Sequence, residues 1–158
     1  MPSARTILKA VLLVGTLDIA AALIHFYIKT GKAPFKPVLT FVASGLLGKT
    51  AFTNGDGMML AGLLIHYCIA AAVTVFFFLT IAQTQFAKEQ KMLTGILYGT
   101  FVWAVMNLLI LPLTKAPKLP IEFWSIVIGM LILICCVGLP LSYISTAGQK
   151  KESIESSH

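Results

Sequence analysis

Charged residues are scarce in this chain of 158 residues, where Lys, Arg, Asp and Glu together make up only 11%. Ordinary soluble domains carry about 25% charged residues, because most of their surface faces water. Hydrophobic residues make up 58% of the chain, and one water-soluble core of this size cannot bury them all. The composition therefore excludes an ordinary soluble domain and predicts a membrane protein.

Cysteine is also rare, and the three copies, Cys68, Cys135 and Cys136, all fall within apolar runs. Adjacent cysteines rarely bridge each other, and a free cysteine packs as a small hydrophobic residue. The spacing matches neither a disulfide framework nor a metal site. We therefore expect no disulfide, no metal and no cofactor.

Long hydrophobic runs are what the sequence has in abundance. Four of them cover approximately residues 7–28, 58–84, 92–114 and 121–146. A helix rises 1.5 Å per residue, so each run is about 30 Å long or more, which matches the hydrocarbon thickness of a bilayer. We predict an all-α membrane protein, a bundle of four transmembrane helices in one domain over residues 1–147. The polar tail, residues 148–158, lacks periodicity and is expected to be disordered.

The segment between the first two runs, residues 38–52, reads "VLTFVASGLLGKTAF". Fifteen mostly apolar residues are too few to span a bilayer and too apolar for a solvated loop. Irregular backbone at membrane depth is tolerated only where protein or water surrounds it. We therefore expect a short re-entrant or interfacial segment that packs against the helix bundle.

This segment contains "ASGLLGKT", which fits a loose phosphate-binding loop pattern. A real phosphate-binding loop follows a buried strand and opens a full helix, and the residues that follow here, "AFTNGDG", form a turn cluster. We interpret the glycines as packing positions, and Lys49 as a side chain that extends to the membrane surface.

Basic residues give no clear membrane orientation. If the N-terminus is cytoplasmic, each side carries six: Arg5, Lys9, Lys88, Lys91, Lys150 and Lys151 inside, and Lys29, Lys32, Lys36, Lys49, Lys115 and Lys118 outside. The positive-inside rule therefore does not decide the orientation, and we favour a cytoplasmic location for both chain ends because the first helix has a basic N-terminal flank.

The net charge of +6 predicts contact between the protein and anionic lipid headgroups of the bilayer. The charges are too dispersed for nucleic acid.

Each run has one face of small and polar residues. In "GTLDIAAALIH", Asp18 and His25 are seven residues apart and share a helix face with Gly15 and Ala22. Such faces turn inward in a bundle, because hydrocarbon cannot satisfy polar groups. The corresponding faces of the other runs carry Gly62, His66, Ala70 and Thr74; Thr100, Ala104 and Asn107; and Glu122, Ser125, Gly129 and Cys136.

Depth predicts which polar residues meet. We count residues from the helix ends that lie on the side of the first loop. The count places Asp18, His66 and Asn107 at depths of about 15, 12 and 10 Å below that surface of the membrane. A charge at the centre of a bilayer needs a partner, so we predict a polar core cluster of these three residues. The mouth of the cluster is expected to carry His25, Tyr27, Ser44, Lys49 and Glu122.

Several roles for this cluster remain open. It holds the helices in register if its hydrogen bonds are structural, at about 0.6–2 kcal/mol each, and it forms a pathway if its ionisable groups are functional. A catalytic site is disfavoured because no nucleophile stands out, and haem ligation because His25 and His66 differ in depth by about 7 Å. We expect a non-enzymatic protein, either a small-solute or proton pathway, as an oligomer, or an accessory or scaffold subunit of a larger membrane complex.

Proline affects the fourth run. Pro140 lies inside it, and proline lacks the N–H group that an α-helix needs. We therefore expect a kink or the end of the helix near Leu139.

The order of five segments carries a family resemblance. "GTLDIAAAL", "ASGLLGKTAF", "GLLIHY", "YGTFVWAVMNLLILPLTKAP" and "VGLPL" together resemble small bacterial inner-membrane proteins similar to the YagU-like family. The resemblance extends from about Gly15 to Pro140. It implies a multi-pass protein of the bacterial inner (plasma) membrane with a four-helix fold, and it implies no particular substrate or reaction.

Overall fold

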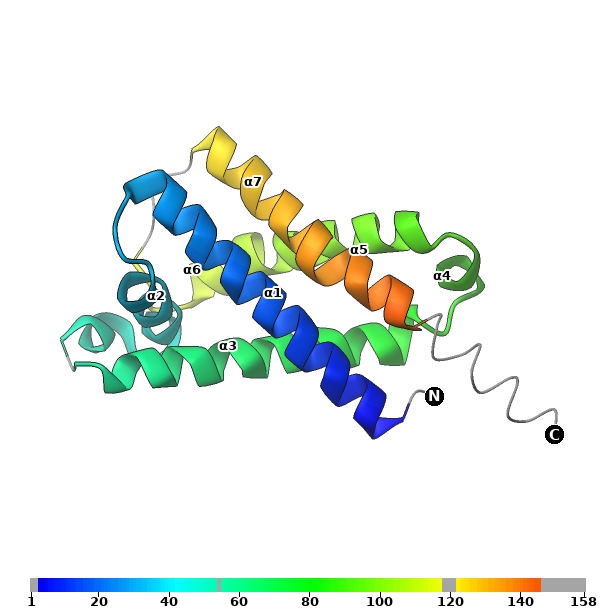
Figure 1. Ribbon diagram of the computed structural model, residues 1–158, viewed down its shortest axis with the longest axis horizontal. Coiled ribbons are helices and arrows are strands. Elements are labelled where there is room, and N and C mark those ends of the chain that lie inside the picture. The colour runs from blue at the N-terminus through cyan, green and yellow to red at the C-terminus, as the bar shows by residue number, and fades with distance from the viewer. Residues whose placement is uncertain (1–2, 54, 118–121, 146–158) are drawn as a thin grey trace.

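The computed structural model describes residues 3–53, 55–117 and 122–145 (Figure 1). Four helical spans are long and apolar enough to cross a membrane: Ala4–Thr30, Gly57–Ile81, Lys91–Leu113 and Phe123–Ser145. The described residues form no strand. The predicted all-α class with four long apolar helices is therefore confirmed, and the architecture is that of a multi-pass membrane protein. The predicted tail, residues 148–158, and both predicted ends of the fourth run, 121 and 146, lie outside the described residues.

The first span, α1 (Ala4–Thr30), is continuous α-helix between two caps. The Ser3 hydroxyl accepts a hydrogen bond from the backbone N–H of Thr6 at 3.3 Å. At the other end Gly31 has a φ of 65°, and its N–H donates to the carbonyl of Tyr27. Glycine adopts this left-handed conformation at little steric cost, so the helix ends there.

The other three spans each include a stretch of π-helix, in which backbone hydrogen bonds reach one residue further than in an α-helix. They are α3 (Gly57–Phe76) with η2 (Phe77–Ile81), α5 (Lys91–Ala104) with η3 (Val105–Ile110) and α6 (Leu111–Leu113), and α7 (Phe123–Leu133) with η4 (Ile134–Gly138). The fourth span does not end at Leu139 but continues to Ser145. A proline ring clashes with the carbonyl four residues earlier, and for Pro140 that residue is Cys136, where the wider turn of η4 makes room.

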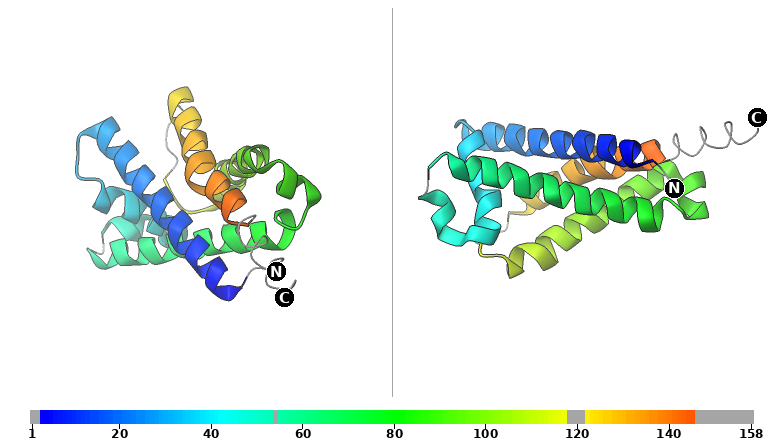
Figure 2. Two further views of the ribbon diagram at one scale, coloured as in Figure 1. Left: turned by 45° about the vertical axis from the view of Figure 1, so that its right-hand side comes forward. Right: turned by 90° about the horizontal axis from the view of Figure 1, so that it is seen from below.

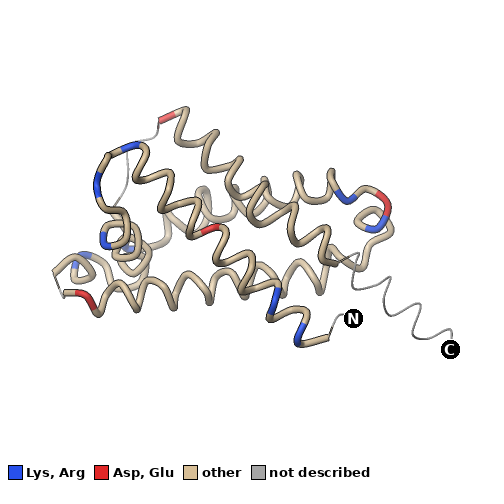
Figure 3. The backbone as a smooth tube through the Cα atoms, in the orientation of Figure 1, with Lys and Arg blue, Asp and Glu red and all other residues tan. Residues whose placement is uncertain are grey.

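Successive spans run in opposite directions, so that α1 begins and the fourth span finishes at the same end of the bundle (Figures 1 and 2). We call this the terminal end. It also carries the short helix α4 (Gln85–Glu89), which joins the second and third spans. The opposite end, which we call the α2 end, carries α2 (Phe35–Leu47) and η1 (Gly48–Phe52). Lys, Arg, Asp and Glu gather at the two ends, with one acidic position midway along α1 (Figure 3).

The predicted apolar segment between the first two spans forms α2, which lies across the ends of the long helices (Figure 2). It crosses α3 at Gly62, where an added Cβ would overlap the backbone carbonyl of Leu39. The backbone N–H of Lys115, after α6, donates to the carbonyl of Gly45 in α2 at 3.0 Å. One face of α2 is buried, and Leu46 on the other is 62% exposed. Contacts with α3 and with the residues that follow α6 therefore fix this helix at the end of the bundle.

The core lies where all four spans meet, towards the terminal end. It includes Ala10, Val14, Phe77, Phe78, Tyr98, Val102, Val137 and Leu141. Glycines bring α5 against the fourth span, because an added Cβ at Gly138 would overlap the carbonyl of Gly95, as in close helix pairs of membranes. Only 17–28% of the most apolar window of each span is buried. Most of the apolar surface of the spans therefore faces outward, as is typical of helices that cross a membrane.

Candidate functional site

Asp18 and His66 form the centre of the site. Asp18 is the single acidic residue of α1, and its Oδ2 atom lies 4.0 Å from Nδ1 of His66 on α3. The side chains are 26% and 11% exposed, respectively. The structure thus brings together two of the three residues of the predicted core cluster, one from each of two neighbouring spans.

A hydrogen bond of the other ring nitrogen, Nε2, fixes the orientation of the His66 ring. Nε2 lies 2.8 Å from the backbone carbonyl of Gly15, and a carbonyl only accepts, so Nε2 carries a hydrogen. Nδ1 is therefore the ring nitrogen that faces the Asp18 carboxyl group. A Cβ at Gly15 would come within 2.8 Å of the Tyr67 ring, so glycine permits the close approach of α1 and α3 that makes this hydrogen bond.

Asn107, the third predicted member of the cluster, does not contact the pair. Its side-chain amide is exposed and donates to the carbonyl of Trp103 in its own span at 3.0 Å. The depth argument assumes regular α-helix, whereas Asn107 lies within η3. A π-helical stretch turns the following side chains to another face, which explains why the expected face was wrong here.

The fourth span packs against α1 through η4. Cys136 lies in this stretch. Its sequence signal was its position on the face that also carries Glu122 and Ser125, although we interpreted it only as a packing residue. The α1 helix therefore packs against both α3 and η4.

A pocket of about 260 Å³ lies between α1 and α7 at the α2 end. It is lined by His25, Ile28, Lys29, Glu122, Trp124, Ser125 and Ile128. His25 and Glu122 belong to the predicted mouth, and His25 lies two helical turns from Asp18 on the same face of α1. The pocket therefore lies on the side of α1 that leads to the Asp18–His66 pair.

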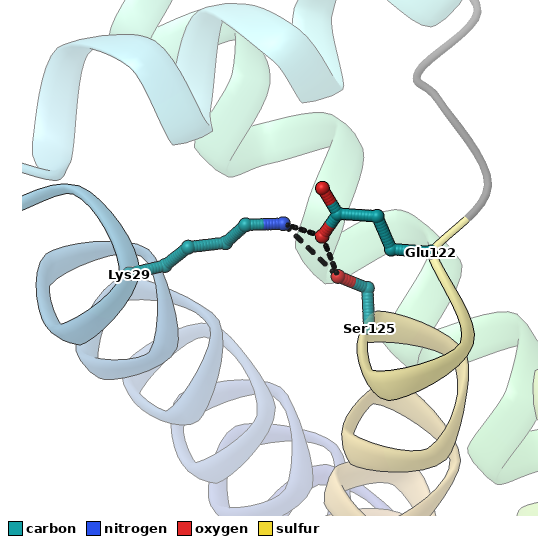
Figure 4. Close-up of polar contacts among 3 residues, drawn as sticks. All are labelled: Lys29, Glu122 and Ser125. Carbon is teal, nitrogen blue, oxygen red and sulfur yellow. Dashed lines mark hydrogen bonds and ion pairs between the residues drawn. The ribbon is translucent and has the colours of Figure 1, made fainter.

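Three polar residues of the pocket bond to one another (Figure 4). Lys29 donates to the Glu122 carboxylate at 2.5 Å and to the Ser125 hydroxyl at 3.1 Å, and Ser125 donates to Glu122 at 3.2 Å. The hydrogen bond from Lys29, the one from Ser125 and the positive charge of Lys29 lower the pKa of Glu122 below its ordinary value. Sequence reasoning missed Lys29 as a partner, because it was counted only as a surface charge.

The remaining predicted mouth residues lie outside the pocket. Tyr27 is 57% exposed, and Ser44 is fully buried, where it donates to the carbonyl of Phe41 in α2. Lys49 is exposed on η1. A helix, and not a strand, precedes Lys49, so the phosphate-binding loop pattern lacks the strand that it needs.

No protein-family model, curated protein or solved structure matches this chain. In the described ranges, no group of three or more His, Cys, Asp or Glu side chains is placed to hold a metal ion. A functional proposal therefore has to rest on the Asp18–His66 pair and on the pocket beside it.

Proposed function

We propose that this protein provides a pathway for protons, or for a small solute coupled to protons, with Asp18 and His66 as the proton-binding pair. The observation that carries the proposal is the 4.0 Å approach of the Asp18 carboxylate to Nδ1 of His66, midway along two apolar spans. A proton that leaves the carboxyl group has a basic nitrogen to receive it, and the reverse step restores both groups.

Energetics favour this role over a purely structural one. A carboxylate at the centre of a helix costs about 2.5–3.5 kcal/mol to insert, whereas polar contacts between membrane helices contribute about 0.6 kcal/mol on average. One such contact does not offset the cost, and an alanine or serine at position 18 would avoid it. A functional need for the ionisable group explains why the chain carries it.

The pocket supports an access route from the α2 end. His25 lines the pocket and shares the α1 face of Asp18, and Asp18 itself is 26% exposed. Lys29 and Glu122 stand at the same opening. A proton or small polar solute would enter between α1 and α7 and reach the pair along this face.

The second candidate is an accessory or scaffold subunit of a larger membrane complex. The outward apolar surface favours it, since large side chains such as Phe101, Leu113 and Trp124 are 48%, 78% and 70% exposed. Such a surface suits lipid, a second copy of the chain or a partner subunit. The two candidates differ in one measurable property, because a scaffold conducts nothing.

We also propose a bacterial inner membrane as the location, on the resemblance of the five sequence segments to the YagU-like proteins. We assign α2 to the membrane surface, where Lys32, Lys36, Lys49 and Lys115 would contact anionic lipid headgroups. Binding to vesicles of increasing anionic lipid content, compared at low and high salt, tests this assignment.

Reconstitution into liposomes that contain a pH-sensitive dye tests the proton pathway. With an imposed pH difference, the natural protein is expected to speed the dye response beyond that of protein-free liposomes. Asp18→Asn should abolish the effect, while Asp56→Asn, the same change at an exposed surface carboxylate, should preserve it. A natural protein that matches protein-free liposomes would leave the scaffold role as the better explanation.

A further inference from the structure

Two buried hydroxyl groups in the described part of the chain have no hydrogen-bond partner. They belong to Thr74 on α3 and Thr94 on α5, which are 0% and 3% exposed. Other described threonines donate to a carbonyl three or four residues earlier: Thr30, Thr40, Thr50, Thr53, Thr80, Thr84 and Thr114. Thr74 and Thr94 make no such bond. The carbonyl three residues before Thr94, that of Lys91, accepts from the Ser142 hydroxyl at 2.6 Å.

A buried hydroxyl without a hydrogen-bond partner destabilises the folded protein, because it has lost its bonds to water and gained none in return. Proteins normally satisfy such groups, and ordered water is the usual partner when no protein atom is in reach. Two such groups in one small core suggest that the same kind of ligand binds at each. Water fits this role, because it can both donate to a hydroxyl and accept from it.

The two threonines lie on the way from the Asp18–His66 pair to the terminal end. Thr74 follows His66 by eight residues on the buried face of α3, a distance of about 12 Å. The Tyr98 hydroxyl donates to the carbonyl of Val73 at 2.6 Å, so Tyr98 lies at the depth of Thr74. Thr94 is one turn closer to the terminal end on the same helix as Tyr98.

We propose that Thr74 and Thr94 each bind a buried water molecule, and that these waters belong to a chain of water that forms the terminal-end half of the proton route. The inference rests on the proposed function of the Asp18–His66 pair. Without water, a proton at His66 is 15 residues, or about 22 Å, from the end of the second span at Ile81. Water at Thr74 divides this distance into intervals of about 12 Å and about 10 Å. Each interval needs further water, because a proton moves only between groups that are hydrogen-bonded to each other. In each step a water accepts one proton and releases another, so the hydroxyls and waters are unchanged.

Stability tests whether the sites are hydrated. Valine has the shape of threonine without the hydroxyl, so Thr74→Val and Thr94→Val remove the water's partner. Hydrated sites predict a fall in the unfolding temperature in detergent of about 2–4 °C for each variant. Thr80→Val is the matched control, since its exposed hydroxyl bonds only to the carbonyl of Phe76, and it should leave the temperature unchanged. Dry sites predict an equal or higher temperature for both core variants, which would overturn the inference.

Proton flux in liposomes tests the role of the waters. Thr74→Val and Thr94→Val should lower the flux by about tenfold, the effect of 1.36 kcal/mol on a barrier. Thr74→Ser, which keeps the hydroxyl, and Thr80→Val should preserve it. If flux needs Asp18 but not the two hydroxyls, the route proposed here is wrong and the proposed function stands. If the natural protein shows no flux, the proposed function and this route fail together, and the unfolding temperatures still decide whether the sites hold water.

Discussion

Lys29 and Glu122 join the ends of α1 and α7 although they are 93 residues apart in the chain. Both residues line the pocket between α1 and α7, and their side chains point toward each other from the two helices (Figure 4). Both side chains are about half exposed, at 49% and 53%, so water and salt screen their attraction. The pair therefore links the two helix ends but contributes only modestly to the overall stability.

The first prediction concerns the pH dependence of this ion pair. Because the folded-state pKa of Glu122 lies below the ordinary value of 4.5, its stabilising contribution is complete above 4.5 and is lost as the pH falls through the lowered pKa. The unfolding temperature of Glu122→Gln should therefore be lower than that of the natural protein near neutral pH, and the two temperatures should converge as the pH falls below the lowered pKa of Glu122. Glu89→Gln, on exposed α4, is the control. A difference that persists unchanged at low pH would contradict the assignment.

The second prediction is that Asp18 and His66 are energetically coupled. A double-mutant cycle with Asp18→Asn and His66→Gln should give a coupling near 1 kcal/mol, within the range for contacts between membrane helices. Each single change leaves the other group buried without its partner, so the double variant loses less than the sum. A control cycle with Asp18→Asn and Asn107→Ala should be additive. Additivity in the first cycle would show that the pair does not interact.

The third prediction concerns the crossing of α2 and α3. Gly62→Ala places a Cβ against the backbone carbonyl of Leu39, so the two helices must separate, at a cost of about 1–3 kcal/mol. Gly57→Ala is the matched control on the same helix, because nothing lies within 4 Å of an added Cβ there. The measurement is the free energy of unfolding in detergent. Equal values for the two variants would mean that α2 does not pack on α3 in this way.

The fourth prediction concerns membrane topology. Lys32 follows α1 at the α2 end, and Lys88 lies in α4 at the terminal end. Cysteines introduced at these positions, with the three native cysteines replaced, should react with an impermeant reagent from opposite sides of the membrane. A cytoplasmic N-terminus predicts that Lys32→Cys reacts in whole cells and Lys88→Cys only after lysis. Labelling of both from one side would rule out this arrangement. Position 118, which suits the same test, lies outside the described residues.

Residue counting predicted the Asp18–His66 contact because both residues lie in regular α-helix. In α1 and α3 the rise of 1.5 Å per residue holds over the whole interval, so equal depth and facing small residues bring the side chains together. The same count failed for Asn107, which lies in η3. Apolar residues dominate all the spans alike, so nothing in their pattern marks where an α-helix widens into π-helix.

The ion pair of Lys29 and the pocket beside it could not be predicted from the sequence, for a different reason. A lysine at the end of an apolar run looks like any other surface charge, and its choice of partner depends on the tilt of α1 relative to α7. That tilt follows from contacts elsewhere, such as Gly15 against Tyr67 and Gly138 against Gly95. These contacts involve glycines, which carry no side chain that a sequence pattern could pair.

The sequence alone determined that this protein has four long apolar helices and approximately where they lie, because apolar runs of more than about 20 residues are long enough for a membrane-spanning helix and too long for ordinary strands. It also determined that Asp18 needs a partner within the bundle. Only the tertiary structure decided that His66 and not Asn107 provides it, that Lys29 bonds to Glu122, and that Thr74 and Thr94 are left without a bond. These outcomes depend on how the helices are tilted, how they are rotated about their axes and where π-helical turns occur. A few close contacts between helices determine these three properties.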